Sequence, residues 1–258
     1  MPSAARVLTA PFTVLAALAL VACTADGDAT ATPSRGADAP PSAAAPPSAA
    51  GTAALSPADT PTCLPEGTAT VTAGPEADPT LVSFTGAGSK GVLLAPQDQG
   101  DACQWADELA RLAGEGYLVA SFGWSGDGET SFVAAVDVLR SLGAADVALV
   151  GASKGGTYAA ALADDVDAAS VVALGPPAAF DGQDAQSASS GYTGPLLVVA
   201  STDDSSVGVD SSRDVSRADD PSTFLELAGS AHGVALLTSE HREHVQQAID
   251  ETLAAGFA

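Results

Sequence analysis

The sequence predicts an α/β fold, with a mostly parallel central sheet covered by helices on both faces. Short β-branched or apolar runs alternate with segments of helical spacing from residue 68 to the end of the chain. The later runs show no polar and apolar alternation, which is typical of strands buried on both faces, whereas the first two alternate and fit an antiparallel edge. The 258 residues suffice for one sizeable domain.

The expected elements can be placed along the chain. Eight runs are predicted to be strands: 69–72, 81–84, 91–95, 117–122, 146–150, 169–174, 196–200 and 223–227. Apolar stripes at helical spacing predict two helices that end near glycines, Gly114 and Gly143. Further helical segments are expected over 157–163 and 240–253.

The first 22 residues read as a targeting segment. They contain Arg6 and an apolar run over 11–22, which is too short to cross a bilayer as a permanent helix. Residues 1–22 are therefore expected to be a signal peptide. The segment Leu20-Val21-Ala22-Cys23 resembles the bacterial lipobox. That resemblance implies a lipid on Cys23 and anchoring to the outer face of the bacterial cell membrane; an ordinary signal peptide with an incidental cysteine is the alternative.

A tether is expected between the anchor and the domain. Residues 24–61 consist mainly of Ala, Pro, Ser, Thr, Gly and Asp, with Leu55 as the only large apolar side chain. We therefore assign 23–62 to the lipidated cysteine and a disordered tether, and 63–258 to the α/β domain. With Cys23 lipidated, Cys63 and Cys103 are a candidate disulfide of an oxidising compartment, or else two unpaired buried thiols.

The charge and composition of the chain limit the classes of partner that it is expected to bind. The formal net charge is −23, and because Arg6 is the only charge before residue 26, a chain starting at Cys23 carries −23 − 1 = −24. Such a surface repels nucleic acid and anionic membranes. The lipid is thus the only membrane contact expected. We expect a monomer, without a nucleic-acid partner and without a metal or other cofactor.

The main chemical motif follows the strand predicted to end at Val150. It reads Gly151-Ala-Ser153-Lys-Gly155 and runs directly into an alanine-rich helical segment. This arrangement resembles the nucleophile elbow of α/β-hydrolases and implies their fold. In a chain this rich in glycine and serine the pentapeptide alone is weak evidence. Its strand-turn-helix context strengthens it and makes Ser153 the expected nucleophile.

Two later loops supply the partners that a serine nucleophile needs. The family order of serine, acid and histidine is met by Asp204, in a loop with an aspartate three residues before a valine, and by His232 after the last strand. The register favours Asp204 over Asp203. The other histidines, His241 and His244, fall in the expected C-terminal helix and are interpreted as surface residues.

The family resemblance also implies an oxyanion hole made of backbone amides. Lys154 would supply one amide, with its ammonium expected to be solvated. Asp98 would supply the second, with Gln97 as the runner-up. Here Pro96 stands where many relatives have histidine, which is similar to cutinase-like polyester hydrolases.

The connection between residues 175 and 195 is short and polar, so little or no cap and an open site are expected. Trp124, Phe180 and Tyr192 are candidate cleft residues. The resemblance to small esterases and dienelactone hydrolases implies a serine hydrolase that cleaves carboxylic esters, with a small-molecule or acyl-ester substrate. The alternatives are a peptidase or amidase with the same triad and a non-catalytic ligand-binding lipoprotein with this fold.

Overall fold

The structure is a computed structural model that describes residues 55–258. Its main sheet confirms the predicted α/β class. In spatial order, the nine strands of this sheet are β1 (Ser56–Ala58), β2 (Ala69–Ala73), β3 (Thr80–Gly86), β5 (Leu118–Phe122), β4 (Lys90–Ala95), β6 (Asp146–Ala152), β7 (Ala168–Leu174), β10 (Leu196–Ser201) and β11 (Phe224–Leu227). The expected signal peptide 1–22, Cys23 and the tether up to residue 54 lie outside the described residues.

Strands β5, β4, β6, β7, β10 and β11 are parallel neighbours, and β1, β2 and β3 join them in antiparallel pairs. All eight predicted strands are present. A small hairpin adds β8 (Ala179–Phe180) and β9 (Gln183–Asp184). The helices are α1 (Ala106–Gly114), α2 (Gly128–Ser141), α3 (Lys154–Ala161), α4 (Ala185–Ser189), α5 (Val209–Arg213) and α6 (Arg242–Gly256), with short 3₁₀ helices η1 (Ala102–Trp105), η2 (Pro221–Thr223) and η3 (Gly233–Thr238).

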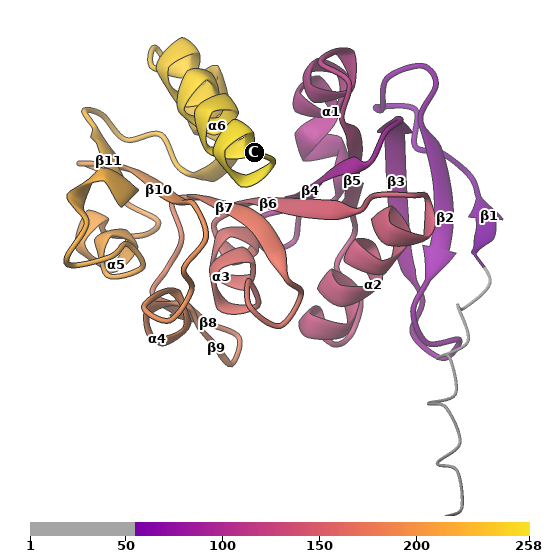
Figure 1. Cartoon of the computed structure of the whole chain (residues 1–258), viewed down its shortest axis with the longest axis horizontal. Coiled ribbons are helices and arrows are strands. Elements are labelled where there is room, and N and C mark those ends of the chain that lie inside the picture. The colour runs from indigo at the N-terminus through magenta and orange to yellow at the C-terminus, as the bar shows by residue number, and fades with distance from the viewer. Residues whose placement is uncertain (1–54) are drawn as a thin grey trace, which may run out of the picture. The chain divides into compact units, whose positions relative to one another are not determined.

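Helices cover both faces of the sheet, with α1 and α6 on one side and α2 and α3 on the other (Figure 1). Successive strand residues alternate between the two cores because side chains alternate along a strand. In β4, for example, Leu93 packs in the α2 and α3 core, whereas Val92 and Leu94 pack in the α1 and α6 core. This double coverage explains why the parallel strands are apolar without a break.

The first strand corrects the expected end of the tether. Residues 56–58 fall within 23–62, yet they form β1 and pair with β2, with Ser56 opposite Thr72. Backbone pairing at a sheet edge needs no apolar side chains, and an edge strand tolerates Pro57 because the proline there need not donate to the ladder. Leu55 packs against the core beside it. The folded part of the chain therefore begins before Cys63.

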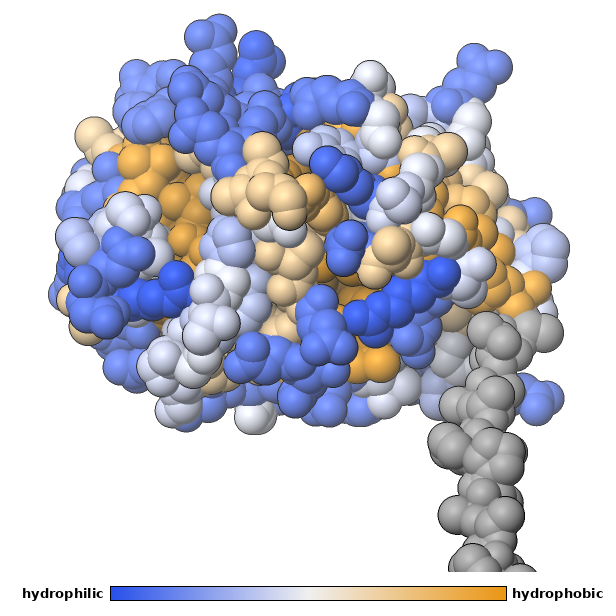
Figure 2. All heavy atoms as spheres, viewed as in Figure 1, coloured by the Kyte–Doolittle hydropathy of each residue, from blue (hydrophilic) through white to orange (hydrophobic). Residues whose placement is uncertain are grey.

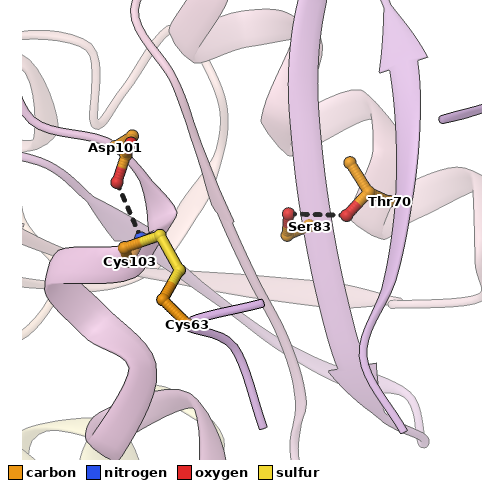
Figure 3. The surroundings of a disulfide bond; sticks show 5 residues. All are labelled: Cys63, Thr70, Ser83, Asp101 and Cys103. Atoms are coloured by element: carbon orange, nitrogen blue, oxygen red, sulfur yellow. Dashed lines mark hydrogen bonds between the residues drawn. A yellow bond between two sulfur atoms is a disulfide. The ribbon is translucent and has the colours of Figure 1, made fainter. Parts of the chain in front are cut away.

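The predicted disulfide between Cys63 and Cys103 is present, with Cα atoms 5.7 Å apart (Figure 3). Asp101 caps η1 and accepts a hydrogen bond from the Cys103 amide at 2.9 Å. The bridge thereby joins the segment before β2 to the helical turn that leads into α1.

Helix α3 approaches the ends of β4 and β6 closely, and two glycines permit this approach. A Cβ at Gly155 would lie 2.3 Å from the Ala95 carbonyl oxygen, and one at Gly151 would lie 2.1 Å from the Gly155 carbonyl oxygen. Any side chain at either position would force the helix away from the sheet. The contact fixes the start of α3 at the carboxyl edge of the parallel strands, where open α/β sheets place their sites.

The face shown in Figure 2 is mostly hydrophilic, with smaller hydrophobic areas between the polar ones. Within residues 55–258, none of the helices combines the length and the apolar character that crossing a membrane requires.

Replacing both bridge cysteines with serine should lower the free energy of unfolding by about 4 kcal/mol, because the bridge closes a loop over a sequence separation of 40. For a domain of this size, that loss corresponds to a melting temperature lower by roughly 10 °C. Calorimetry with and without reductant measures it. The serine variant should be insensitive to reductant, and an unchanged melting temperature would show that the bridge contributes no stability.

Gly155→Ala should destabilise the protein by about 2 kcal/mol or more, because the added methyl group meets backbone atoms that cannot rotate away. Gly114→Ala is the matched control, since a Cβ at the end of α1 would meet nothing within 4 Å. That change should leave stability equal or slightly higher. Urea unfolding of the two variants makes the comparison; equal midpoints would contradict the close contact.

Candidate functional site

Ser153 occupies a strained turn between β6 and α3. Its φ of 50° and ψ of −118° place a non-glycine residue in the left-handed half of backbone space, a conformation that costs energy and persists only where neighbouring contacts impose it. The Ser153 amide donates to the Leu174 carbonyl oxygen at 2.8 Å, and the Ser153 carbonyl accepts from the Thr157 amide at 3.0 Å. These bonds tie the turn to the end of β7 and to the first turn of α3.

His232 and Asp204 come together from the loops after β11 and β10. His232 Nδ1 lies 2.6 Å from Asp204 Oδ2, and the other carboxylate oxygen accepts from the amides of Ser206 at 2.8 Å and Val207 at 3.2 Å. The Asp204 side chain is only 1% exposed. A carboxylate oxygen that accepts a hydrogen bond at Nδ1 favours the tautomer that carries its proton there, which leaves Nε2 free to accept a proton.

The turn after β7 brings Ser153 and His232 to one corner. The Leu174 carbonyl oxygen accepts the hydrogen bond from the Ser153 amide. The next residue, Gly175, lies directly against His232, since a Cβ at Gly175 would be 3.1 Å from the imidazole Nδ1. Among the bonds of residues 55–258, none links the Ser153 hydroxyl to the imidazole. Such bonds are often long before substrate binds and shorten in the complex.

The remaining acidic and histidine candidates lie elsewhere. Within residues 55–258, the Asp203 side chain accepts a single hydrogen bond, from the neighbouring Thr202 hydroxyl at 3.3 Å. His241 contacts the Ala228 carbonyl through Nε2 at 2.9 Å. His244 borders a depression at the other edge of the sheet, beside the start of β10. The structure therefore pairs His232 with Asp204, as the sequence register predicts.

The two candidates for the second oxyanion amide, Gln97 and Asp98, both lie in the loop after β4, but the hydrogen bonds of their amides differ. The Gln97 amide is occupied by the Gln104 side chain at 3.1 Å. The Asp98 amide has no hydrogen-bond partner within residues 55–258. The Gln97 side chain instead accepts from the Val234 amide at 2.8 Å and so braces the loop against the turn that follows His232. Sequence reasoning missed this bracing role, because only three-dimensional proximity reveals it.

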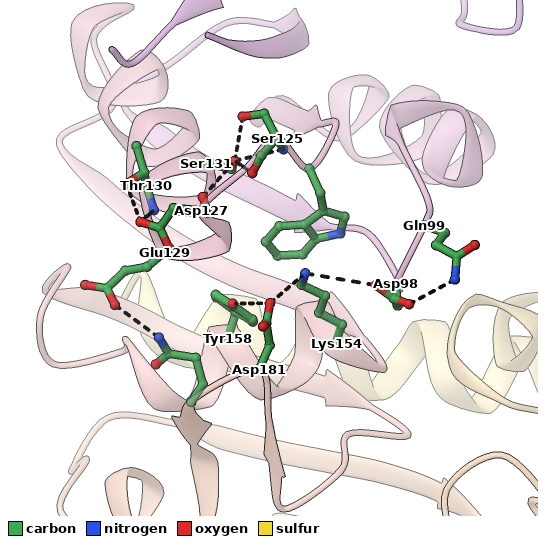
Figure 4. A network of polar contacts seen from close by, with 12 residues as sticks. Asp98, Gln99, Ser125, Asp127, Glu129, Thr130, Ser131, Lys154, Tyr158 and Asp181 are labelled. Carbon is green, nitrogen blue, oxygen red and sulfur yellow. Dashed lines mark hydrogen bonds and ion pairs between the residues drawn. The ribbon is translucent and has the colours of Figure 1, made fainter. Parts of the chain in front are cut away.

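The environment of the Lys154 side chain differs more from the sequence prediction than that of any other site residue discussed above. Its ammonium was expected to be solvated, but its side chain is only 10% exposed. Nζ forms an ion pair with Asp181 at 3.0 Å and lies 4.0 Å from Asp98 (Figure 4). It also sits over the ring of Trp124, at 4.5 Å from the centroid. The aromatic face and the acidic partners together offset the cost of burying the charge.

Asp181 links the β8–β9 hairpin to α3. It accepts from the Lys154 ammonium and from the Tyr158 hydroxyl, the latter at 3.1 Å. The Lys154 bond first, and then the Tyr158 bond, lower the pKa of Asp181. Burial and then the bond to Asp181 raise the pKa of Tyr158. Sequence reasoning did not single out Asp181, although Asp-Gly between two short runs is a strong hairpin signal.

The three candidate cleft residues separate into two groups. The Trp124 indole donates to the carbonyls of Pro96 at 3.2 Å and Gln97 at 3.0 Å, and Phe180 is 37% exposed with its ring 5.9 Å from the Lys154 ammonium. Tyr192, by contrast, is not a cleft residue. It is 5% exposed and its hydroxyl donates to Ala168 at the start of β7, because the chain has already returned to the opposite edge to begin β10.

No family model and no curated protein matches this chain. Solved structures do match it. An α/β serine hydrolase homologue from Coxiella burnetii has a TM-score of 0.55 and 19% identity, over 70% of this chain and 96% of the other. A serine hydrolase without a lid from Xanthomonas campestris has a TM-score of 0.55 and 16% identity, over 73% and 96%. An esterase from Pyrococcus furiosus has a TM-score of 0.54 and 17% identity, over 72% and 90%. The described domain therefore has the α/β-hydrolase fold.

Proposed function

We propose that this chain is a serine hydrolase that cleaves carboxylic esters through an acyl-enzyme intermediate. The observation that carries the proposal is the 2.6 Å contact between His232 and a buried Asp204, beside the corner to which the strained Ser153 is bonded. A buried aspartate and an imidazole alone could be structural. A strand-to-helix turn with only a structural role would not need a serine in the left-handed conformation next to them, because glycine adopts that conformation at lower energetic cost.

In the proposed reaction the Ser153 hydroxyl attacks the ester carbonyl while His232 Nε2 takes its proton. Asp204 holds the ring and stabilises the imidazolium as it forms. The imidazolium then gives its proton to the departing alcohol oxygen. A water molecule, deprotonated by the same nitrogen, attacks the acyl-enzyme and releases the acid and the free serine.

The amides of Lys154 and Asp98 are proposed to stabilise the oxyanion. Lys154 is the first residue of α3, so its N–H has no partner within the helix, and the positive end of the helix dipole adds to its effect. Asp98 is favoured over Gln97 because the Gln97 amide already donates to Gln104. The Lys154 ammonium, 4.0 Å from the Asp98 carboxylate, offsets part of the charge that would oppose an oxyanion there.

Ester substrates are favoured by the site and by the similar proteins. The connection after β7 forms only a short hairpin and the five-residue α4, so little covers the Ser153 corner from that side. Structures similar to this one include esterases and an enol-lactonase. Export and lipid anchoring at Cys23 are part of the proposal; the lipobox-like Leu20-Val21-Ala22-Cys23 and the disulfide, a bond typical of oxidising compartments, support them.

Ser153→Ala should abolish turnover of a para-nitrophenyl ester while leaving the melting temperature unchanged or higher, because the strained turn loses only a hydroxyl. A fluorophosphonate probe should label the natural protein, and peptide mapping should locate the label on Ser153. Ester cleavage that survives in the alanine variant would refute the assignment. Failure of the natural protein to take up the probe would favour a non-catalytic binding protein.

Asp204→Asn should reduce kcat by about 10³- to 10⁴-fold, since asparagine can hold the ring only in the wrong tautomer. Asp203→Asn is the neighbouring control, which removes the same charge from the same loop and should change kcat less than about threefold. Steady-state kinetics on one ester substrate decides between them. Equal losses in the two variants would contradict the pairing of Asp204 with His232.

A further inference from the structure

Lys154 follows the proposed nucleophile in the chain, and its ammonium is enclosed. Its Nζ lies 4.5, 5.5 and 5.9 Å from the ring centroids of Trp124, Tyr158 and Phe180. These rings come from the loop after β5, from α3 and from the β8–β9 hairpin. Because little water reaches the ammonium, its interactions with nearby charges are stronger than those of an exposed lysine.

The charges around this ammonium do not sum to a positive site. Asp181 lies 3.0 Å from Nζ and Asp98 lies 4.0 Å from it, so one positive charge faces two negative ones. Both carboxylate side chains are about half exposed, at 52% and 47%. The carboxylates are therefore the accessible part of this group, whereas the cation, with a side chain only 10% exposed, is shielded.

Asp181 is the stronger of the two partners. It forms the shorter ion pair and also accepts the Tyr158 hydroxyl bond, and its pKa is lowered by those two contacts, so it remains ionised at neutral pH. It stands at the tip of a two-residue hairpin turn with Gly182, and both residues have positive φ, at 52° and 85°. Strands of two residues are not stable alone, so these bonds to α3 also fix the hairpin.

We propose that the Lys154–Asp181 ion pair is the charge-specificity element of the site. While Asp181 neutralises the ammonium, the site accepts neutral acyl esters and rejects those with a carboxylate on the acyl chain. Without Asp181 the ammonium becomes a receptor for such a carboxylate. The inference rests on the proposed ester hydrolysis and adds to it the charge class of the substrate and the two residues that select it.

The test uses two esters that differ only in charge, para-nitrophenyl hexanoate and mono-para-nitrophenyl adipate, in which a carboxylate replaces the terminal methyl group. The natural protein should prefer the hexanoate by about tenfold or more in kcat/KM. The preference should shrink at 1 M salt, where the Debye length is about 3 Å. The net charge of −23 also repels the anionic ester and is screened by salt, so the variants below assign the preference to the pair itself.

Asp181→Asn should reduce that preference by about tenfold, mainly through a lower KM for the adipate. Asparagine keeps an acceptor for Tyr158, so the hairpin should stay in place. Asp184→Asn is the matched control: it removes one charge from the same hairpin, where Asp184 caps α4 through Ser187, and asparagine caps equally well. This control should keep the natural preference. Lys154→Met combined with Asp181→Asn should restore rejection of the adipate.

Equal preferences in Asp181→Asn and Asp184→Asn would overturn the inference, and so would a double variant that accepts the adipate as well as Asp181→Asn does. Both results leave hexanoate hydrolysis by the natural protein intact, so they count against the charge selection alone. If the natural protein cleaves neither ester faster than Ser153→Ala does, the proposed function fails and the inference falls with it.

Discussion

The site depends on the contact between the first turn of α3 and the ends of β4 and β6. The Ala95 carbonyl fills the space in which a side chain of Gly155 would lie, so helix and sheet meet at backbone distance. The same turn holds the strained Ser153, begins the helix at Lys154 and sets the approach of the loop after β4. If this contact were opened, the serine would lose its strained geometry and the two amides proposed for the oxyanion would move apart.

Much of this arrangement could be predicted from the sequence because it follows from backbone requirements. Uninterrupted apolar runs indicated parallel strands, and the glycines around Ser153 marked a turn too tight for side chains. The order of Ser153, Asp204 and His232 placed them after three different strands, and the structure brings the last two into contact. Such features are local in sequence, or depend on a sheet edge whose position the strand order determines.

Other features depend on long-range geometry that no local pattern carries. The burial of Lys154 requires a tryptophan from one loop and an aspartate from a hairpin 27 residues further along. Tyr192 looked like a cleft residue because its connection begins at the site, but the chain had already crossed to the far edge. Strand β1 was missed because backbone bonds, rather than apolar side chains, hold Ser56–Ala58 to the sheet.

That first strand also bears on mechanical load. A pull on the chain from its N-terminal side would first reach the few backbone bonds between β1 and β2. If they gave way, tension would pass through residues 59–62 to Cys63 and across the covalent bridge to Cys103, in η1. The strand would then act as a breakable link and the bridge as a covalent stop, which divides the load between the segment before β2 and η1.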